Sequence, residues 1–203
     1  MLDLDRITCV RGNRPLFADL TLSLQPGECM HVRGDNGTGK TSLLRTVCGL
    51  AQPESGRVLW QGQPIDQAQG FHDDLLYLGH ALALKDDLTA VENLSMQAGI
   101  AGTTLAPAAA MQALTQLGLR AGHHHLPARL LSQGQRRRVA LARLLVTRAR
   151  LWVLDEPVVA LDAAAQQAFG KAVETHAAQG GMTLLTSHQS LPLGGLTCRE
   201  IHL

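Results

Sequence analysis

The chain has 203 residues, of which 45% are hydrophobic and 17% charged, so it is long enough to bury a core and short enough to form one domain. Its formal net charge is +1 at pH 7, which excludes binding to nucleic acid or to an acidic membrane driven by the charge of the whole molecule. The N-terminus lacks the basic and apolar segments of a secretory signal, and no uncharged apolar run reaches the length of about 18 residues that spans a membrane. We therefore expect an ordinary soluble globular protein.

The four cysteines, Cys9, Cys29, Cys48 and Cys198, are widely spaced and form no CxxC pair. This spacing argues against a zinc site and against a disulfide framework. A reducing cytosol is the compartment that this use of cysteine favours.

Strand and helix signals alternate along the chain. Residues 27–34 have the character of a short strand between glycines, and residues 40–50 have the apolar spacing of a helix that ends at Gly49. Residues 57–65 indicate a hairpin that turns at Gly62, and residues 149–157 and 180–188 look like strands buried on both faces. Residues 106–119 and 131–149 are helical in period. The pattern predicts an α/β fold in a single domain, 1–203, with a mostly helical insertion between about Phe71 and Thr147.

The strongest local motif is GDNGTGKT at residues 34–41, which fits the phosphate-loop pattern G-x-x-x-x-G-K-[ST] between a strand and a helix. Its glycines let backbone N–H groups and the helix N-terminus surround phosphate oxygens. Lys40 would hold the β- and γ-phosphates, and the Thr41 hydroxyl would bind the Mg²⁺ that bridges them. The alternative is a plain glycine turn before a helix. The predicted nucleotide-binding residues are Gly34, Asp35, Asn36, Gly37, Thr38, Gly39, Lys40, Thr41 and Ser42.

A second motif, LWVLDEP at residues 151–157, carries Asp155 to the end of a buried strand, where ligands bind in open α/β sheets. Asp155 could bind Mg²⁺, and Glu156 could orient or deprotonate a water that attacks the γ-phosphate. His188 follows another buried strand and could sense the same phosphate. The alternatives are a solvated acidic pair and an ordinary loop histidine.

A third motif is LSQGQ at residues 131–135, at the start of a helix. Ser132 stands at the N-cap position, Gly134 leaves the backbone accessible, and the helix dipole favours an anion there. Since one nucleotide already has its phosphate loop, a second phosphate site makes sense if two copies pair head to tail. The alternatives are a capped helix and a basic face for nucleic acid, but with 3% aromatic residues the chain has little on which bases could stack. That basic face would consist of Arg136, Arg137, Arg138 and Arg143.

Taken together and in this order, the motifs resemble those of the ATP-binding subunits of ABC transporters. The resemblance covers a Walker A loop at 34–41, the signature at 131–135, a Walker B strand ending in Asp155 and Glu156, a D-loop with Asp162, and the switch His188. It implies a RecA-like P-loop core with a small antiparallel β part and a helical subdomain. It also implies a homodimer that encloses two ATP molecules with Mg²⁺ and reopens on hydrolysis. Each copy's signature, through Ser132, Gly134 and Gln135, would then meet the γ-phosphate bound by the other copy.

Two positions depart from the pattern of this family. Where an aromatic residue usually stacks on adenine, the chain has Arg11, whose guanidinium can also lie on a base. Where a glutamine usually contacts Mg²⁺, the chain has His80, so a neutral imidazole would have to replace an amide.

Several segments are similar to the ATP-binding subunits that serve cytochrome c maturation: VLWQGQPI, YLGH, LTAVENL, RRVALARL and LWVLDEP. This resemblance implies an ATPase that powers haem export or release of a haem-loaded chaperone. It implies a peripheral position on the cytoplasmic face of the bacterial inner membrane, with integral membrane subunits as partners. Residues 81–92 would lie near the groove for those subunits.

The histidine run at 123–125 and three alternative functions remain to be considered. We expect the run His123 to His125 to be solvated, with no direct haem binding and no nucleic acid partner. A small-molecule kinase would leave the signature and His188 unexplained. A soluble ABC-type ATPase of DNA repair or translation usually has a coiled-coil insertion or a second cassette, which the chain lacks. An ATPase subunit for another ABC cargo stays open.

Overall fold

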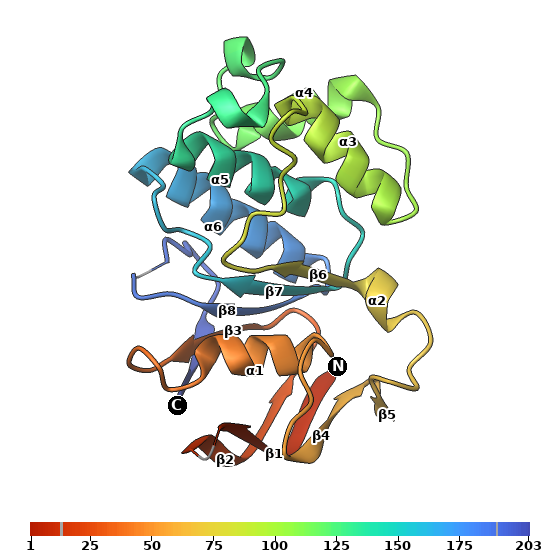
Figure 1. Ribbon diagram of the computed structural model, residues 1–203, viewed down its shortest axis with the longest axis vertical. Helices are drawn as coiled ribbons and strands as arrows, with labels where there is room; N and C mark the ends of the chain where they lie inside the picture. Colours follow the sequence, from red (N-terminus) through yellow and green to blue (C-terminus); the bar gives the residue numbers. More distant parts are fainter. Residues whose placement is uncertain (13, 190) are drawn as a thin grey trace.

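The chain folds around two β-sheets, one antiparallel and one parallel, as the computed structural model in Figure 1 shows for residues 1–12, 14–189 and 191–203. The antiparallel sheet has the order β2-β1-β4-β5, from Arg14–Leu24, Leu2–Arg11, Ser55–Trp60 and Gln63–Pro64. The parallel sheet has the order β6-β7-β8-β3-β9, from Leu75–Leu78, Leu151–Asp155, Met182–Thr186, Cys29–Arg33 and Cys198–His202.

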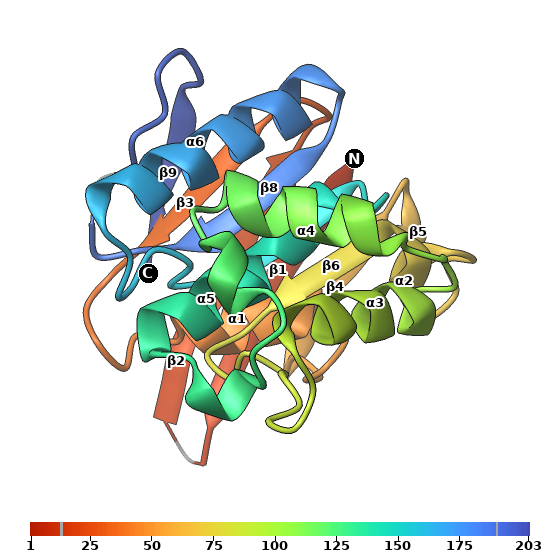
Figure 2. The ribbon, with the colours of Figure 1, turned by 90° about the horizontal axis from the view of Figure 1, so that it is seen from above.

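Helices cover both faces of the parallel sheet. Helix α1 (Lys40–Val47) lies between the two sheets in Figure 1. Helices α3 (Ala90–Ile100), α4 (Pro107–Gln116), α5 (Gln133–Ala142) and α6 (Ala163–Ala178) lie over the opposite face, which Figure 2 shows from above. Short turns complete the fold: α2 (Phe71–Asp74), η1 (Ala121–His123), η2 (Ala128–Leu130) and η3 (Arg143–Leu145).

The core is divided by the parallel sheet, and strand β7 shows why its sequence is apolar throughout. Leu151 and Val153 pack into the cluster with α1 and the antiparallel sheet, while Trp152 and Leu154 pack into the cluster under the helices. Since side chains alternate between the faces of a strand, a strand covered on both sides needs apolar residues at every position. The predictions of buried strands at 149–157 and 180–188 are confirmed.

The other local predictions are confirmed as well, with one difference inside the helical range. The hairpin pairs Trp60 with Gln63, and Gln61 and Gly62 both have positive φ, 53° and 81°, as a tight two-residue turn requires. Within the range predicted as mostly helical, about 71–147, residues Leu75–Leu78 form β6 at the edge of the parallel sheet. Among the described residues, no helix combines the length and apolar character needed to cross a bilayer.

One cysteine pair contradicts the expectation from spacing. Cys29 and Cys198 are 169 residues apart in sequence and form a disulfide, because β3 and β9 run parallel with these two residues in register. Sequence spacing cannot reveal such a pair, since the strand register alone brings the two residues together. Cys9 and Cys48 are buried free thiols, and burial raises the pKa of Cys48 to about 12.

Candidate functional site

The phosphate loop joins β3 to α1, and its glycines have backbone angles that other residues adopt at a cost. Gly34, Gly37 and Gly39 have φ of 149°, 87° and 108°. A Cβ on Gly34 would lie 2.7 Å from the Thr38 hydroxyl oxygen and 2.9 Å from a backbone oxygen of Leu203. The loop therefore requires glycine for space as well as for φ.

Lys40, the first residue of α1, turns back over this loop. Its Nζ donates to the carbonyl oxygens of Gly34 and Asp35, at 2.7 and 3.0 Å, and the Thr38 hydroxyl donates to the same Asp35 oxygen at 3.1 Å. The ammonium group thus lies beside the backbone N–H groups of a helix start, which suits an anion of several charges.

A cavity of about 270 Å³ opens beside the loop. It brings together residues that are far apart in the sequence and includes Arg11, the predicted adenine partner. The residues that line it are Arg11, Leu16, Asn36, Gly37, Gly39, Lys40, Thr41, Ser42, Asp155, Glu156 and His188.

Asp155 ends β7 and accepts two hydroxyl hydrogen bonds. The Thr41 hydroxyl donates to Oδ2 at 2.9 Å, and the Thr186 hydroxyl donates to Oδ1 at 2.8 Å. A carboxylate and a hydroxyl oxygen side by side are the ligand types that Mg²⁺ prefers, so Thr41 and Asp155 fit the metal role predicted for them.

Glu156 follows with φ of 50°, a conformation that is costly for a residue with a side chain and that points to a functional constraint. Its backbone N–H donates to the Thr186 hydroxyl at 3.0 Å. Its carboxylate lies 3.5 Å from Nε2 of His188 and accepts the His188 backbone N–H at 3.3 Å. The turn thus directs the two neighbouring carboxylates to different partners, Asp155 to Thr41 and Glu156 to His188.

The signature residues lie at the N-terminus of α5, apart from this cavity. Ser132 is the N-cap: its hydroxyl accepts the Gln135 N–H at 3.3 Å, and the Gln135 side chain accepts the Ser132 N–H at 2.8 Å. A Cβ on Gly134 would lie 2.8 Å from the Ala160 carbonyl oxygen. Within one chain, Ser132, Gly134 and Gln135 are not among the residues that line the phosphate-loop cavity.

The arginines of α5 make contacts within the chain. Arg137 is buried and donates to the backbone carbonyls of Pro157 and Glu156, and burial lowers its pKa. Arg136 pairs with Asp86 at 2.7 Å. Arg138 pairs with Asp162, which is the N-cap of α6. Arg137 and Arg138 thus attach the signature helix to the segment between the Walker B strand and α6, and Arg136 attaches it to the loop before α3.

Sequence reasoning missed Thr186, Arg137 and His31 as parts of this site. Thr186 was visible only as one polar residue in the strand LLT, Arg137 as one of three adjacent arginines, and His31 as a histidine inside an apolar strand. His31 is buried, and its Nε2 lies 2.8 Å from the carbonyl oxygen of Ser187.

The remaining histidines lie away from the cavity. His80 is exposed in the loop after β6 and is not among the residues that line the cavity. The expectation that the run 123–125 is solvated is wrong for His124, which is buried with Nε2 against the Leu119 carbonyl oxygen at 2.9 Å. Among the residues that the structure describes, no group of three or more His, Cys, Asp or Glu side chains could hold a metal ion.

Comparisons with known proteins agree with this geometry. The family model described as ABC transporter matches residues 17–159, more than half of the chain. The chain is 49% identical to the cytochrome c biogenesis ATP-binding export protein CcmA of Nitrosomonas europaea, over 100% of this chain and 95% of that protein. It is 47% identical to the CcmA of Dechloromonas aromatica over all of both chains, and 44% identical to that of Escherichia coli O157:H7 over 100% and 96%.

Solved structures share the fold. A putative ABC transporter ATP-binding protein from Pyrococcus furiosus superposes with a TM-score of 0.85 at 25% identity, covering 100% of this chain and 96% of the other. A dimeric ATP-binding cassette bound to ADP and phosphate superposes with a TM-score of 0.80 at 22% identity, covering 93% and 88%. The predicted α/β cassette fold, with its antiparallel part and helices, is confirmed. The chain belongs to the ABC transporter family and, within it, to the cytochrome c biogenesis ATP-binding export proteins.

Proposed function

We propose that the chain hydrolyses ATP and that this hydrolysis powers a membrane complex that matures c-type cytochromes. The main support for ATPase activity is that five predicted site residues line one cavity at the carboxyl ends of parallel strands. These residues are Lys40, Thr41, Asp155, Glu156 and His188. Ligands bind at this edge in open α/β sheets.

The chemistry follows from the position of each group. Lys40 and the loop N–H groups hold the β- and γ-phosphates, and His188 contacts the γ-phosphate from the opposite side. The Glu156 carboxylate accepts the proton of the water that attacks the γ-phosphorus, a role worth about 10²–10⁴ in rate. Thr41 and Asp155 would hold Mg²⁺, which would supply positive charge that offsets the negative charge of the phosphates. His80, exposed after β6 and outside the lining of the cavity, stays a candidate contact for Mg²⁺ in place of the usual glutamine.

A second copy of the chain completes the site. Ser132, Gly134 and Gln135 lie at a helix N-terminus that is free of the chain's own cavity, so the γ-phosphate of the partner's nucleotide is the anion they suit. A solved cassette with the same fold is described as a dimer bound to ADP and phosphate, which supports this arrangement.

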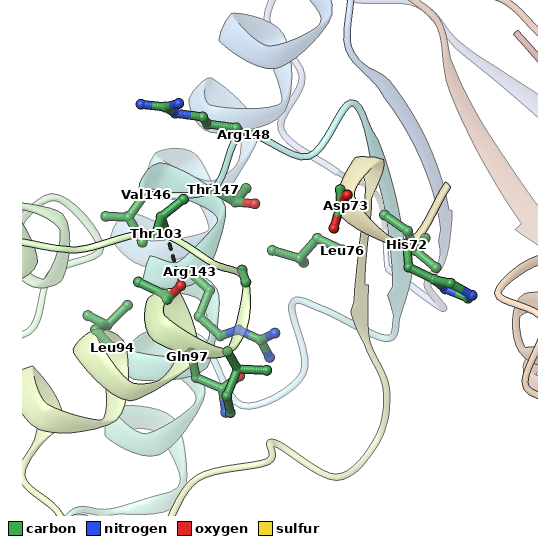
Figure 3. Close-up of a pocket in the computed structure, with 14 residues that line it drawn as sticks. His72, Asp73, Leu76, Leu94, Gln97, Thr103, Arg143, Val146, Thr147 and Arg148 are labelled. Carbon is green, nitrogen blue, oxygen red and sulfur yellow. Dashed lines mark hydrogen bonds between the residues drawn. The ribbon is translucent and has the colours of Figure 1, made fainter. Parts of the chain in front are cut away.

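Integral membrane subunits bind at a cavity of about 300 Å³ between α2, α3 and the segment after α5 (Figure 3). Figure 3 shows Arg143 and Gln97 on one side and Asp73 and Leu76 facing them. Ile100 at the rim is 75% exposed. Burial lowers the pKa of Arg143, whose guanidinium makes no hydrogen bond or ion pair within the described part of the chain. Gln97 donates to the Ala83 carbonyl oxygen at 2.9 Å, which connects this cavity to the loop at 81–92.

The proposed cargo and cellular location rest on the proteins to which the chain is similar. Curated relatives named as cytochrome c biogenesis export proteins match the chain over its whole length, which supports haem export or haem-chaperone release as the work that ATP drives. The protein is then peripheral, on the cytoplasmic face of the bacterial inner membrane, and haem is handled by its membrane partners.

The experiment replaces the chromosomal copy with a Lys40→Ala variant and stains membrane proteins for covalently bound haem. We expect c-type cytochromes to disappear while other haem proteins remain. Lys171→Ala, which removes an exposed lysine of α6, is the matched control and should leave the staining unchanged. Normal staining in the Lys40→Ala strain would assign the ATPase to a transporter with another cargo.

A further inference from the structure

His31 is an unusual residue for its place in the fold. It lies in β3, the strand that leads into the phosphate loop, between Met30 and Val32, which are fully buried. Only 4% of His31 is exposed. A polar group in such a strand costs free energy unless it is hydrogen-bonded, so its partner shows what the residue does.

That partner is the loop that carries the switch histidine. Nε2 of His31 lies 2.8 Å from the carbonyl oxygen of Ser187, the residue before His188. A carbonyl oxygen can only accept, so Nε2 carries the proton and donates. This holds for the neutral and for the protonated ring, because both can carry a proton on Nε2.

The opposite ring nitrogen faces the edge strand. Nδ1 of His31 is 3.9 Å from the Glu200 carboxylate of β9, which pairs with Arg33 at 2.7 Å. The charged groups around the ring are therefore Glu200, Arg33 and, more distant, Glu156. Burial is the largest influence and lowers the pKa of His31, which favours the neutral ring at pH 7.

Further hydrogen bonds hold the described residues of this loop near His188. Ser187 and Gln189 bond each other through the Ser187 hydroxyl, at 3.0 Å in both directions, and Gln166 of α6 donates to the Gln189 side chain at 3.2 Å. The bond from His31 ties the Ser187 backbone to strand β3 of the parallel sheet, one residue from the His188 N–H that Glu156 accepts.

We infer that His31 is a positioning residue for ATP hydrolysis: its hydrogen bond to the Ser187 carbonyl holds the switch loop so that His188 faces Glu156 and the γ-phosphate. This inference rests on the proposed ATPase function. His31 acts through His188 and does not touch the nucleotide, since it is not among the residues that line the phosphate-loop cavity. Its loss should therefore lower kcat and leave ATP binding unchanged.

The test compares His31→Leu, which removes the donor, with His31→Gln, which keeps an N–H group of similar reach. We expect kcat of His31→Leu to fall about ten- to hundredfold, because small misplacements of catalytic groups cost that much. KM for ATP and the Kd for a non-hydrolysable ATP analogue should stay within about twofold on the same reasoning. His31→Gln should recover most of kcat. His176→Leu, at another buried histidine outside the site, is the matched control and should keep full activity.

A double-mutant cycle separates a positioning role from a structural one. If His31 acts through His188, adding His31→Leu to a His188→Ala chain lowers kcat no further, whereas independent roles give losses that multiply. Multiplying losses, or a His31→Leu chain with the kcat of the unaltered protein, would overturn the inference.

A second readout does not depend on hydrolysis. Amide hydrogen exchange of the peptide that covers residues 186–189 should become faster in His31→Leu and stay slow in His31→Gln. Equal exchange in both variants would contradict the positioning role, whether or not the protein hydrolyses ATP. A complete lack of ATP hydrolysis by the unaltered protein would instead refute the proposed function. The two failures are therefore distinguishable.

Discussion

At the scale of single residues, the Thr186 hydroxyl connects the two carboxylate residues of the site. It donates to Oδ1 of Asp155 and accepts the backbone N–H of Glu156, and the residue is fully buried. One small side chain thus fixes the direction of the Asp155 carboxylate and the unusual backbone of Glu156. The turn after β7 is held by the strand next to it, which sequence adjacency alone would not indicate.

The first prediction concerns Glu156. Because its carboxylate accepts the proton of the attacking water, Glu156→Gln should bind ATP and accumulate as a closed dimer with little hydrolysis. ATPase assays and size-exclusion chromatography with ATP measure both effects. Turnover equal to that of the unaltered protein would refute the role of Glu156 as the base.

The second prediction concerns Thr186. Thr186→Val leaves the Glu156 N–H and an Asp155 oxygen without this partner, so we expect a loss of about 1–3 kcal/mol in the free energy of unfolding and a lower kcat. Urea denaturation and ATPase assays measure the two quantities. Thr183→Val on the same strand is the matched control, because the buried Thr183 hydroxyl has no hydrogen-bond partner in the described structure. The prediction fails if both variants lose the same amount.

At the scale of elements, helices α3 and α5 present different surfaces at their ends. The N-terminus of α5 is capped by Ser132 and attached through Arg137 to the loop after β7, whereas α3 ends at the rim of the cavity shown in Figure 3, with Ile100 exposed. One end is therefore suited to an anion and the other to an apolar contact.

The third prediction tests the end of α3. Ile100→Asp places a charge where an apolar contact with the membrane subunits is proposed, so it should weaken co-purification of those subunits about tenfold or more, the equivalent of about 1.4 kcal/mol. Basal ATPase activity of the isolated chain should not change, because Ile100 is remote from the phosphate loop. The control Leu50→Asp alters an apolar residue outside this cavity that is also exposed, by 56%. Equal co-purification of the Ile100 and Leu50 variants would place the contact elsewhere.

At the scale of the whole molecule, two features join distant parts of the chain. The Cys29–Cys198 disulfide ties the C-terminal strand to the strand that leads into the phosphate loop, and the signature at 131–135 lies apart from the phosphate-loop cavity of its own chain. The first feature bears on stability and the second on assembly.

The fourth prediction concerns the disulfide. A bond that closes a loop of this length restricts the unfolded chain, and the chain-entropy model gives about 5 kcal/mol as its upper contribution. Under oxidising conditions Cys198→Ser should therefore lower Tm, and a reducing agent should lower the Tm of the unaltered protein to the same value. Cys48→Ser alters a buried cysteine outside the bond and should not abolish the response to reductant. If the Tm of the unaltered protein were the same with and without reductant, the prediction would be wrong.

The fifth prediction tests assembly. If the signature acts across a dimer, Ser132→Arg and Lys40→Ala chains are each inactive, but a mixture contains heterodimers with one intact site. ATPase activity should then reappear on mixing and reach its maximum near equal amounts of the two chains. Activity that stays absent at every ratio would count against a shared site.

The sequence alone determined the parts of the site that depend on local patterns. The spacing of glycines, Lys40 and Thr41 predicts the phosphate loop because a strand, a turn and a helix start impose it within eight residues. Continuous apolar runs likewise place Asp155, Glu156 and His188 at strand ends, and parallel strands bring such ends to one edge of a sheet. The N-cap residue Ser132 was equally visible, since a cap forms within one helical turn, whereas the reciprocal bond from the Gln135 side chain was found only in the structure.

Only the tertiary structure decided which distant residues meet. The partners of Thr186, Arg137 and His31, and the pairing of Cys29 with Cys198, depend on strand order and register, which are set by the packing of both sheet faces at once. The same packing buries His124 in a run that looks solvated and places β6 in the parallel sheet. Motifs such as the phosphate loop depend on residues close together in sequence. Contacts across the sheet depend on the packing of the whole core, which no short segment specifies.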